Sequence, residues 1–183
     1  MTDRPAALRA AVRAVVAREG FHGASMSAIA AEADVAVGTA YVHYPSKDEL
    51  VVAAYLELKA DLGRAAAGAV DPAAPARERF ETMWLAAHRY FVERPDDANF
   101  LVQFDAGPYG PEGHERAMAV ADDPLVAEAA RPDVAPLLID VPPLLLYDLG
   151  LAPAARVVAN GVELDEPAAA TVAAACWRAI TDR

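Results

Sequence analysis

The sequence predicts an all-α protein. Alanine, which has the highest helix propensity, is abundant, and only 7% of the residues are aromatic. Apolar residues recur at intervals of three and four between capping residues, as expected for amphipathic helices, whereas the β-branched runs that mark strands are scarce. With 183 residues, 55% of them hydrophobic, the chain is long enough to bury a substantial core.

The first helix is expected over residues 5–19. Asp3 can act as its N-cap, Pro5 suits the first turn, and Gly20 stands where a glycine commonly ends a helix. The apolar stripe of this helix consists of Leu8, Val12, Val15 and Val16.

Two short helices follow, separated by a tight break. Ser25 can cap a helix over 26–33, and a third helix is expected over 38–44, where Pro45 ends it. The break contains Asp34, a residue type that tolerates the left-handed backbone often needed in such turns. Two short helices joined by about four residues form a helix-turn-helix arrangement.

Longer helices are expected after this point. Ser46 and Glu49 form a capping box that begins a helix ending before Pro72, and another helix is expected over 75–93. Asp96 can cap the next helix.

The C-terminal part begins with a segment rich in helix breakers. Residues 107–143 contain many Gly and Pro residues, which predicts short helices and loops. A helical stretch over 154–159 is broken by Gly161, and Asp165 can cap a last helix that runs to about Ile180.

The charge is unevenly distributed along the chain. The net charge is −11, but residues 1–47 carry five basic and four acidic side chains, whereas residues 61–183 carry ten basic and twenty acidic ones. An N-terminal unit can therefore approach a phosphate backbone while an acidic body stays away from it, although the basic excess of that unit is small.

Cysteine usage and hydropathy indicate the compartment. Cys176 is the only cysteine, so an internal disulfide is impossible and a reducing environment is expected. The N-terminus lacks the apolar core of a signal peptide, and no apolar run approaches the roughly 20 residues needed to span a bilayer. We expect a soluble, cytoplasmic protein without a membrane partner.

Residues 25–50 carry motifs at a fixed spacing. The segment contains Gly38-Thr39-x-Tyr41 followed by Pro45-Ser46-Lys47. In this pattern the chain resembles the TetR family of transcriptional regulators, without a gap, from the first helix into the fourth. The resemblance implies a three-helix helix-turn-helix DNA-binding domain over 1–47 and a helical effector-binding and dimerisation domain over 48–183.

The resemblance also implies a function. It predicts a homodimer that binds a double-stranded DNA operator and is a repressor released by a small-molecule effector. The last two major helices, about 143–160 and 165–181, are expected to form the dimer interface. An effector-binding helical protein that has lost DNA binding is the alternative. An α-helical enzyme has less support, because no acid–base or nucleophile set is visible.

Eight residues are expected to contact DNA. Gly38 allows close approach of the helix backbone, Thr39 offers a hydroxyl to phosphate and a methyl to thymine, and Tyr41 can present its hydroxyl to phosphate. Ser27 and Val37 are the expected base contacts. Taken singly, each is more often a cap or a packing residue, so the argument depends on their spacing. The set is Ser25, Ser27, Val37, Gly38, Thr39, Tyr41, His43 and Lys47.

The chain departs from the family pattern around the turn. Asp34 stands where the family usually has Gly, Ala36 where it has Ser, and Val37 where a polar or basic residue is common. Ala36 removes the usual cap of the third helix, a loss of about 1 kcal/mol. Asp34 brings a negative charge near DNA, so modest affinity and an uncommon operator are expected. Tyr44 is expected to pack in the core, because the family has Phe there.

No catalytic, metal or cofactor motif is visible, so the effector site can only be approached through packing patterns. Ligand cavities in helical bundles are lined by apolar and aromatic side chains with a few polar groups. Most such residues are simply core residues, and the sequence does not name the ligand. The candidate effector-binding residues are Met83, Trp84, His88, Phe91, Phe100, Phe104, Tyr109 and His114.

Overall fold

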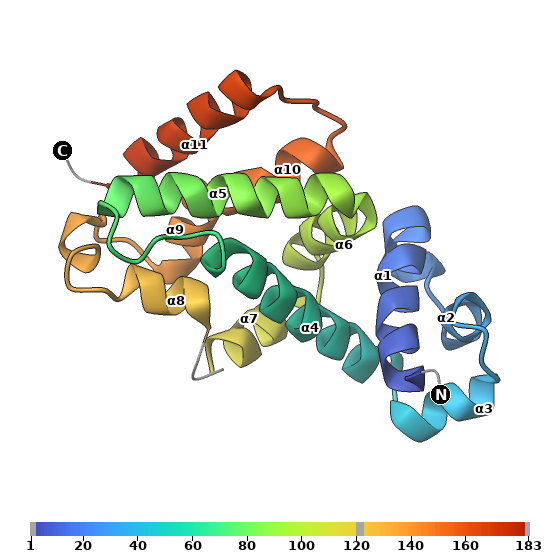
Figure 1. The fold of residues 1–183 in the computed structure, drawn as a ribbon. Coiled ribbons are helices and arrows are strands. Elements are labelled where there is room, and N and C mark those ends of the chain that lie inside the picture. The colour runs from blue at the N-terminus through green and yellow to red at the C-terminus, as the bar shows by residue number, and fades with distance from the viewer. Residues whose placement is uncertain (1–2, 120–122, 182–183) are drawn as a thin grey trace. The chain divides into compact units, whose positions relative to one another are not determined.

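Helices form all the regular secondary structure of residues 3–119 and 123–181, the part of the chain that this computed structural model describes (Figure 1). Within these residues the strand-type pairing is a single isolated bridge between Leu138 and Thr181. The predicted all-α fold, with an N-terminal helix-turn-helix, is confirmed.

The chain forms two compact units. Unit 1 comprises residues 1–59 and 96–119, and unit 2 comprises residues 60–95 and 120–183. The helix-turn-helix therefore shares a compact unit with a later segment of the chain. The functional division at residue 47 is not tested by this packing and stays a prediction.

Unit 1 contains the three N-terminal helices, the first part of a long helix and two later helices. At α1, the Asp3 carboxylate accepts from the Ala6 amide at 3.3 Å, which confirms the predicted N-cap. At α4, the Ser46 hydroxyl accepts from the Glu49 amide at 3.1 Å, as the capping box predicts. The helices are α1 Arg4–Gly23, α2 Met26–Glu32, α3 Val37–His43, α4 Lys47–Ala67, α6 Pro95–Ala106 and α7 Gly110–Met118.

The expected stop of α1 at Gly20 is a kink instead. Gly20 has φ 72° and ψ 172°, a conformation that glycine adopts without steric cost, and one more helical turn follows it. The side-chain amide of Gln103 on α6 donates to the Val16 carbonyl in the turn before the kink at 3.0 Å. The Lys47 ammonium donates to the Phe21 carbonyl after it, also at 3.0 Å. The C-terminal end of α1 is thus held from two sides.

Aromatic side chains fill the space beside this kink. Phe21 lies 5.0 Å from Tyr109 between ring centroids and 6.1 Å from Phe100. The rings of Tyr55 and Phe104 are stacked at 4.0 Å. Aromatic pairs at such separations add to the stability that burial alone provides. This cluster packs α1 and the first part of α4 against α6.

An ionic network joins the same helices. Glu57 of α4 accepts from Arg9 at 2.8 Å and from Arg13 at 2.8 Å, both on α1. Arg13 also pairs with Asp97 of α6 at 2.8 Å, and Arg9 donates to the Tyr44 hydroxyl at 2.7 Å. Burial opposes ionisation of Glu57, but the hydrogen bonds from the two arginines outweigh it and hold the Glu57 pKa below its ordinary value.

Unit 2 is built around α5, whose apolar face is buried as predicted. Phe80, Met83, Trp84, Ala87 and Phe91 are each at most 7% exposed. α10 and α11 pack against α5, and α9 packs against both α10 and α11. The elements are α5 Ala76–Glu93, α8 Pro124–Ala129, the 3₁₀ helix η1 Ala135–Leu137, α9 Pro143–Gly150, α10 Ala152–Ala159 and α11 Glu166–Ile180, together with the second part of α4.

A buried arginine fixes the beginning of α5. The Arg79 guanidinium is 1% exposed and lies 2.6 Å from Glu128 and 2.8 Å from Asp133. It also donates to the Ala74 carbonyl at 2.5 Å. Charged groups are buried only when paired in this way, so Arg79 positions α8 and the following loop.

The breaker-rich segment forms short helices and loops, as expected. The expectation for 107–143 is met by α7, α8 and η1, apart from residues 120–122, which lie outside the described part. The Asp165 carboxylate caps α11 by accepting from the Ala168 amide at 2.9 Å. Among the described residues, no helix combines the length and the apolar character that crossing a membrane requires.

The ionic network yields a stability prediction. Glu57→Gln removes the charge that Arg9 and Arg13 share, and we expect it to lower the free energy of unfolding at pH 7 by about 1–2 kcal/mol, between the values for exposed and buried pairs. Because the folded-state pKa of Glu57 is depressed, its contribution is present above the unfolded pKa and is lost as the pH falls through the folded pKa.

Urea unfolding of wild type and Glu57→Gln checks this prediction. The stability gap between them should be full at pH 7 and should shrink on acidification below about pH 4. Glu81→Gln, which removes an exposed pair with Arg77 on α5, serves as a control and should change stability little. A gap of the same size at acidic pH would show that the Glu57 charge does not stabilise the fold.

Candidate nucleic-acid interface

Two short helices form the predicted helix-turn-helix. The Ser25 hydroxyl accepts from the Ala28 amide at 3.1 Å and so caps α2, as predicted. α3 follows after residues 33–36. Ile29, Ala30 and Ala40 have no exposed surface, because α2 and α3 pack on each other and on α1. The inner faces of α2 and α3 are therefore buried, and only the outer face of α3 can contact another molecule.

The turn between α2 and α3 has a left-handed residue at its centre. Asp34 has φ 53°, in the region that usually requires glycine. Its amide donates to the Ala31 carbonyl at 3.2 Å, and the Val35 amide donates to the Ala30 carbonyl at 3.0 Å. This pair of bonds is the Schellman motif that ends helices. The prediction that Asp34 adopts a left-handed backbone is confirmed.

The N-terminus of α3 has no side-chain cap. Ala36 occupies the N-cap position and offers no side-chain acceptor, as expected from its sequence. Four residues then form the outer face of α3: Val37, Gly38, Tyr41 and Val42. Val42 is 81% exposed, and sequence reasoning missed it. Its spacing of four from Gly38 places it on the same helical face as that residue, and that signal could have identified it.

Gly38 has no role in the packing of the protein itself. A Cβ built at this position would meet no atom within 4 Å. Its backbone is helical and its φ is not positive, so an L-residue is sterically acceptable there. A glycine inside a helix costs roughly 0.5–1 kcal/mol relative to alanine. No contact within the described structure requires a glycine at this position. This suggests that the α3 backbone is approached closely by an external surface.

The other predicted DNA-contacting residues surround this face. Ser25, Ser27, Tyr41 and His43 are exposed, and Thr39 is partly exposed. The Ser25 hydroxyl accepts a hydrogen bond in its cap, and its own proton is left for another acceptor. The structure therefore leaves the predicted polar groups accessible, although DNA contact by any of them is untested.

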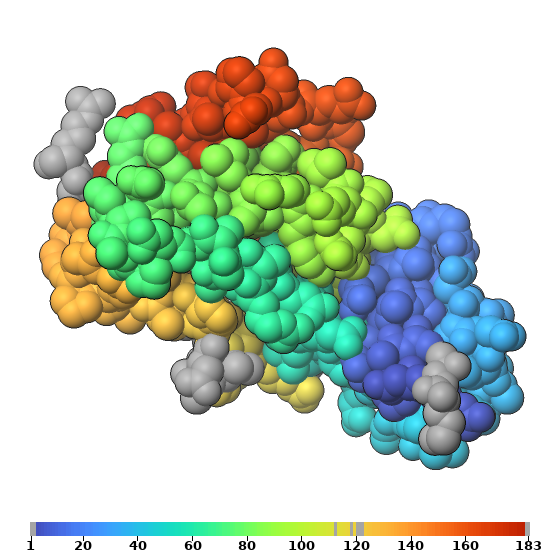
Figure 2. Space-filling model, in the orientation of Figure 1, coloured from blue at the N-terminus to red at the C-terminus, as the bar shows by residue number. Residues whose placement is uncertain are grey.

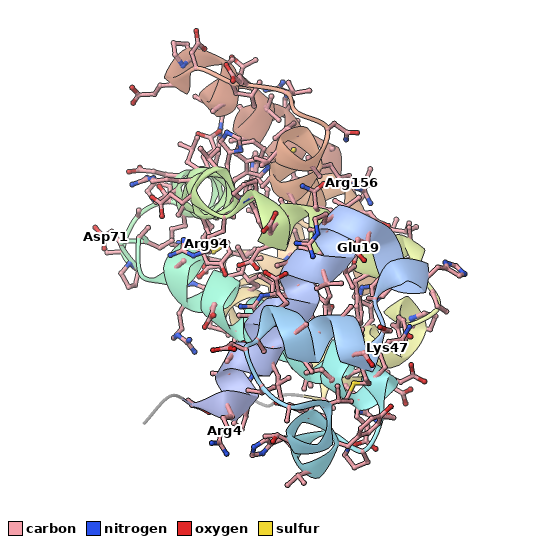
Figure 3. The ribbon with its side chains drawn as sticks, turned by 90° about the vertical axis from the view of Figure 1, so that its right-hand side faces the viewer. Arg4, Glu19, Lys47, Asp71, Arg94 and Arg156 are labelled. Carbon is pink, nitrogen blue, oxygen red and sulfur yellow. The ribbon has the colours of Figure 1, made fainter. Side chains whose placement is uncertain are left out.

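Lys47 has a structural partner that the sequence did not reveal. It lies in the first turn of α4, as Figure 3 shows, and its partly buried ammonium donates to the Phe21 carbonyl. An ammonium carries three donors, so this bond leaves two for a phosphate. Tyr44 is half-buried rather than a full core residue, and its hydroxyl is bonded to Arg9 at 2.7 Å.

The predicted effector residues divide between the two units. Met83, Trp84, His88 and Phe91 lie on α5 in unit 2, and all four are buried. Trp84 and His88 stack at 5.4 Å, and His88 Nδ1 lies 3.5 Å from the Ala154 carbonyl oxygen. The indole Nε1 of Trp84 is buried, and the one acceptor beside it among the described residues is the weakly accepting Cys176 thiol.

The remaining four effector candidates lie in unit 1. Phe100 and Phe104 belong to the aromatic cluster beside α1. Tyr109 donates to Asp48 at 2.7 Å, and burial together with this bond raises the pKa of Tyr109 to about 12. His114 lies 2.9 Å from Asp105. These polar groups already have partners, and whether any of the eight residues contacts an effector is untested.

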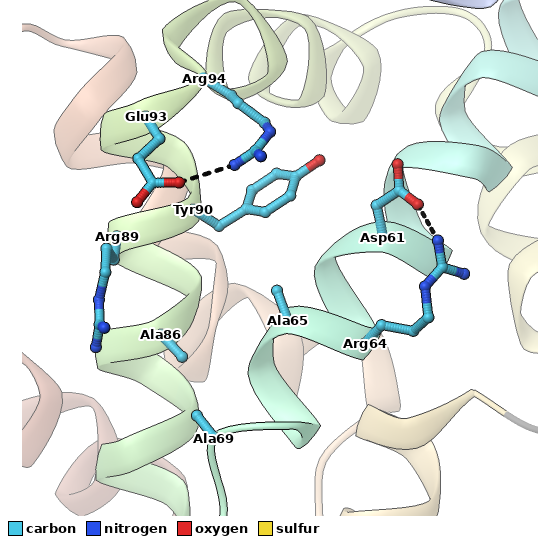
Figure 4. Close-up of a pocket in the computed structure, with 9 residues that line it drawn as sticks. All are labelled: Asp61, Arg64, Ala65, Ala69, Ala86, Arg89, Tyr90, Glu93 and Arg94. Atoms are coloured by element: carbon cyan, nitrogen blue, oxygen red, sulfur yellow. Dashed lines mark hydrogen bonds and ion pairs between the residues drawn. The ribbon is translucent and has the colours of Figure 1, made fainter. Parts of the chain in front are cut away.

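A groove that the sequence did not predict runs between α4 and α5 in unit 2 (Figure 4). Its volume is about 430 Å³, and alanine and arginine side chains form much of its lining. Short alanines and exposed arginines have no distinctive sequence pattern, so only the packing of the two helices reveals it. Among the described residues, no cluster of three or more His, Cys, Asp or Glu side chains is arranged to hold a metal ion.

Comparison with known proteins places this geometry in a family context. Residues 8–54 match the model of the bacterial regulatory proteins of the tetR family. An uncharacterized HTH-type transcriptional regulator of Haemophilus influenzae is 29% identical over 107 residues, which cover 58% of this chain and 57% of that protein. The match thus spans little more than half the length of this relative.

Solved structures share the fold over nearly the whole chain. A TetR-family transcriptional regulator from Haemophilus influenzae superposes with a TM-score of 0.79 at 24% identity, covering 98% of this chain and 97% of that one. A TetR-family transcription regulator from Marinobacter aquaeolei superposes with a TM-score of 0.80 at 24% identity, covering 98% and 96%. Residues 8–54, which include the helix-turn-helix, thus match the tetR family of bacterial regulatory proteins, and the chain shares the fold of solved TetR-family regulators.

Proposed function

We propose that this protein is a homodimeric repressor that binds a double-stranded DNA operator and is released from it by a small-molecule effector. The observation that carries the DNA-binding part is Gly38, a helical glycine that the packing of the protein does not require. Insertion of α3 into the major groove would explain why residue 38 is a glycine, since a backbone without Cβ can approach the duplex most closely.

The outer face of α3 suits a particular mode of readout. Val37 and Val42 are apolar and exposed, and methyl groups of this kind contact the C5-methyl of thymine. Tyr41, 51% exposed, can present its hydroxyl to a phosphate. We infer that base selection depends mainly on apolar contacts, with Ser27 as a hydrogen-bonding reader.

Phosphate contacts would come from the residues around this face. Ser25, Thr39 and His43 offer neutral donors, and Lys47 offers a positive charge next to α3. Such contacts orient the protein on the duplex without reading sequence. Because Lys47 also bonds to the Phe21 carbonyl, a phosphate at this site would be held by a group whose position is already fixed.

The dimer interface is proposed at the end of the chain. The expected segments 143–160 and 165–181 correspond to α9 with α10 and to α11. The outer side of α11 is open to the surface (Figure 2) and presents small exposed residues, Ala170, Thr171 and Ala175. On α9, Leu144, Leu145 and Leu149 are between 43% and 48% exposed. Apolar and small side chains of this kind favour close packing of a second copy.

The effector is proposed to bind in the helical body. The support is the buried Trp84 indole, whose N–H has only the weakly accepting Cys176 thiol beside it, next to His88 on the same helix. A ligand oxygen or nitrogen would be a stronger acceptor for that donor than a thiol. Quenching of Trp84 fluorescence, isolated by Trp177→Phe, measures such binding in the protein that retains Trp84. A ligand that releases DNA yet binds to Trp84→Phe with unchanged affinity, measured by calorimetry, would place the effector elsewhere.

Gly38→Ala separates DNA contact from folding. Because the new Cβ points into open space, the variant should be more stable than wild type by about 0.5–1 kcal/mol in urea unfolding. It should nevertheless bind operator DNA, obtained by selection from genomic fragments, at least tenfold more weakly in a gel shift, since the methyl group occupies the space of the duplex backbone.

Ala10→Ser, on the exposed side of α1, is the control for a small substitution away from α3. Gly68→Ala is unsuitable as a control, because a Cβ there would meet the Arg64 carbonyl at 2.9 Å. Equal DNA affinity of Gly38→Ala and wild type would remove α3 from the groove. Failure of the wild-type protein to select any DNA would favour the alternative, an effector-binding helical protein without DNA binding.

Asp34 gives a second prediction. Asp34→Asn and Asp34→Gly both remove a negative charge next to α3, and we expect both to tighten operator binding several-fold at low salt and less at high salt. Only Asp34→Gly should also stabilise the fold, by about 0.5–1 kcal/mol, because it removes the left-handed strain.

Asp140→Asn, an exposed residue in unit 2, changes the net charge equally and controls for the general effect of charge. The same gel shifts and urea titrations serve for all three variants. If Asp140→Asn tightened binding as much as the Asp34 variants did, the position of Asp34 beside the duplex would be refuted.

The dimer proposal predicts a mass of two chains. Light scattering at micromolar concentration and physiological salt should give about twice 19.3 kDa. Ala175→Arg, which places a long charged side chain on the outer side of α11, should shift this mass toward one chain while the helix content remains. A wild-type monomer under these conditions would contradict the proposal.

A further inference from the structure

The helix proposed to enter the major groove lacks the side chains that read bases by paired hydrogen bonds. α3, Val37–His43, contains no Arg, Lys, Asn or Gln. Arginine and lysine are the usual partners of guanine, and asparagine and glutamine are those of adenine, because each can make two bonds to one base edge. The hydrogen-bonding side chains of α3 are Thr39, Tyr41 and His43, and none of them carries an amide or a guanidinium. α3 therefore needs another means of distinguishing base pairs.

The two valines of α3 lie at the margins of its outer face. At about 100° per residue, the directions of Val37 and Val42 differ by about 140° around the helix axis, and Tyr41 and Gly38 fall inside this angle. Gly38 adds no side chain, so the backbone at the centre of the face can come close to a duplex while a valine projects on either side. Val42 is 81% exposed and Val37 is 38% exposed, so both isopropyl groups can reach base edges.

The spacing of the two valines assigns them to different base pairs. They are five residues apart, which is about 7.5 Å along the axis of an α-helix. The rise of one base-pair step along the duplex is about 3.4 Å, less than half of that distance. One base pair is too short to contact both isopropyl groups, so each valine has its own position in the half-site.

The feature of a base that suits an isopropyl group in the major groove is a methyl group. Thymine carries one at C5, whereas cytosine and uracil have only hydrogen there. In 5-methylcytosine the same methyl group stands at the same ring position. The neighbouring group at C4 differs, an oxygen acceptor in thymine and an amino donor in cytosine, but a valine side chain bonds to neither. A valine therefore has the same apolar contact with both methylated bases.

We propose that α3 recognises the C5-methyl group itself, so that 5-methylcytosine can replace thymine at the positions that Val37 and Val42 contact. This inference rests on the proposed DNA binding and extends its substrate from thymine to DNA methylated at cytosine. A site with a methylated cytosine at such a position would bind more tightly than its unmethylated copy. Val42 should be the more sensitive probe, since most of its side chain is exposed and free of packing within the protein.

Gel shifts with synthetic duplexes of the selected operator test this proposal. Uracil in place of one thymine at a time removes the methyl group and leaves the base pair intact. We expect about fourfold weaker binding for each thymine that a valine contacts, the value of one buried methyl group. At the same position, a cytosine–guanine pair should bind at least as weakly as the uracil–adenine pair. A 5-methylcytosine–guanine pair should recover most of the loss.

Two variants show whether the valines cause this effect. In Val42→Ala the uracil penalty should fall below about twofold at one position of each half-site, and in Val37→Ala at a different one, because the methyl group has lost its partner. Val92→Ala is the matched control, since Val92 is a 57% exposed valine on α5, and it should keep every penalty at its wild-type value. Urea unfolding of each variant verifies that the fold is retained.

Three results would overturn this inference while the proposed function stands. The first is operator binding that no uracil substitution weakens. The second is 5-methylcytosine that binds as weakly as cytosine. The third is a set of uracil penalties that stays unchanged in both Val37→Ala and Val42→Ala, which would assign them to the shape of the DNA. A wild-type protein that selects no DNA at all would instead overturn the proposed DNA binding, and this inference with it.

Discussion

The Glu57 carboxylate is the point on which the architecture of unit 1 depends. It joins α4 to Arg9 and Arg13 of α1, and these two arginines continue the network to Tyr44 after α3 and to Asp97 of α6. Both oxygens of one side chain are thereby used to orient four helical segments. A part-buried carboxylate that lost either arginine would keep its desolvation cost without the compensating bond, so the bonds of the network support one another.

Local sequence signals predicted the elements of this unit well. Asp3, Ser25 and Ser46 cap helices because their side-chain oxygens reach an amide three residues later, a distance that depends on nothing else in the chain. Asp34 is left-handed because a helix must end within a short turn there. The buried faces of α1 and α4 follow from helical periodicity alone, as does that of α5 in unit 2.

Contacts between distant segments could not be predicted in the same way. The bond from Gln103 to the Val16 carbonyl joins residues 87 positions apart, and neither residue type indicates the other. The sequence predicts only a phosphate contact for Lys47, because its bond to the Phe21 carbonyl depends on the kink at Gly20. The α4–α5 groove exists because short alanine side chains do not fill the space between the two helices. Unfilled space of this kind has no recognisable sequence pattern.

The outer α3 face of Val37, Gly38, Tyr41 and Val42, which carries no charge, has a consequence for how such a protein would search a genome. Affinity for random DNA comes almost entirely from counterions that basic side chains displace from phosphates, and residues 1–47 carry only one more basic than acidic group. Most molecules would then stay free in solution instead of occupying non-specific sites. A small number of copies could fill an operator under those conditions, because discrimination depends on the ratio of specific to random binding and not on the strength of either alone.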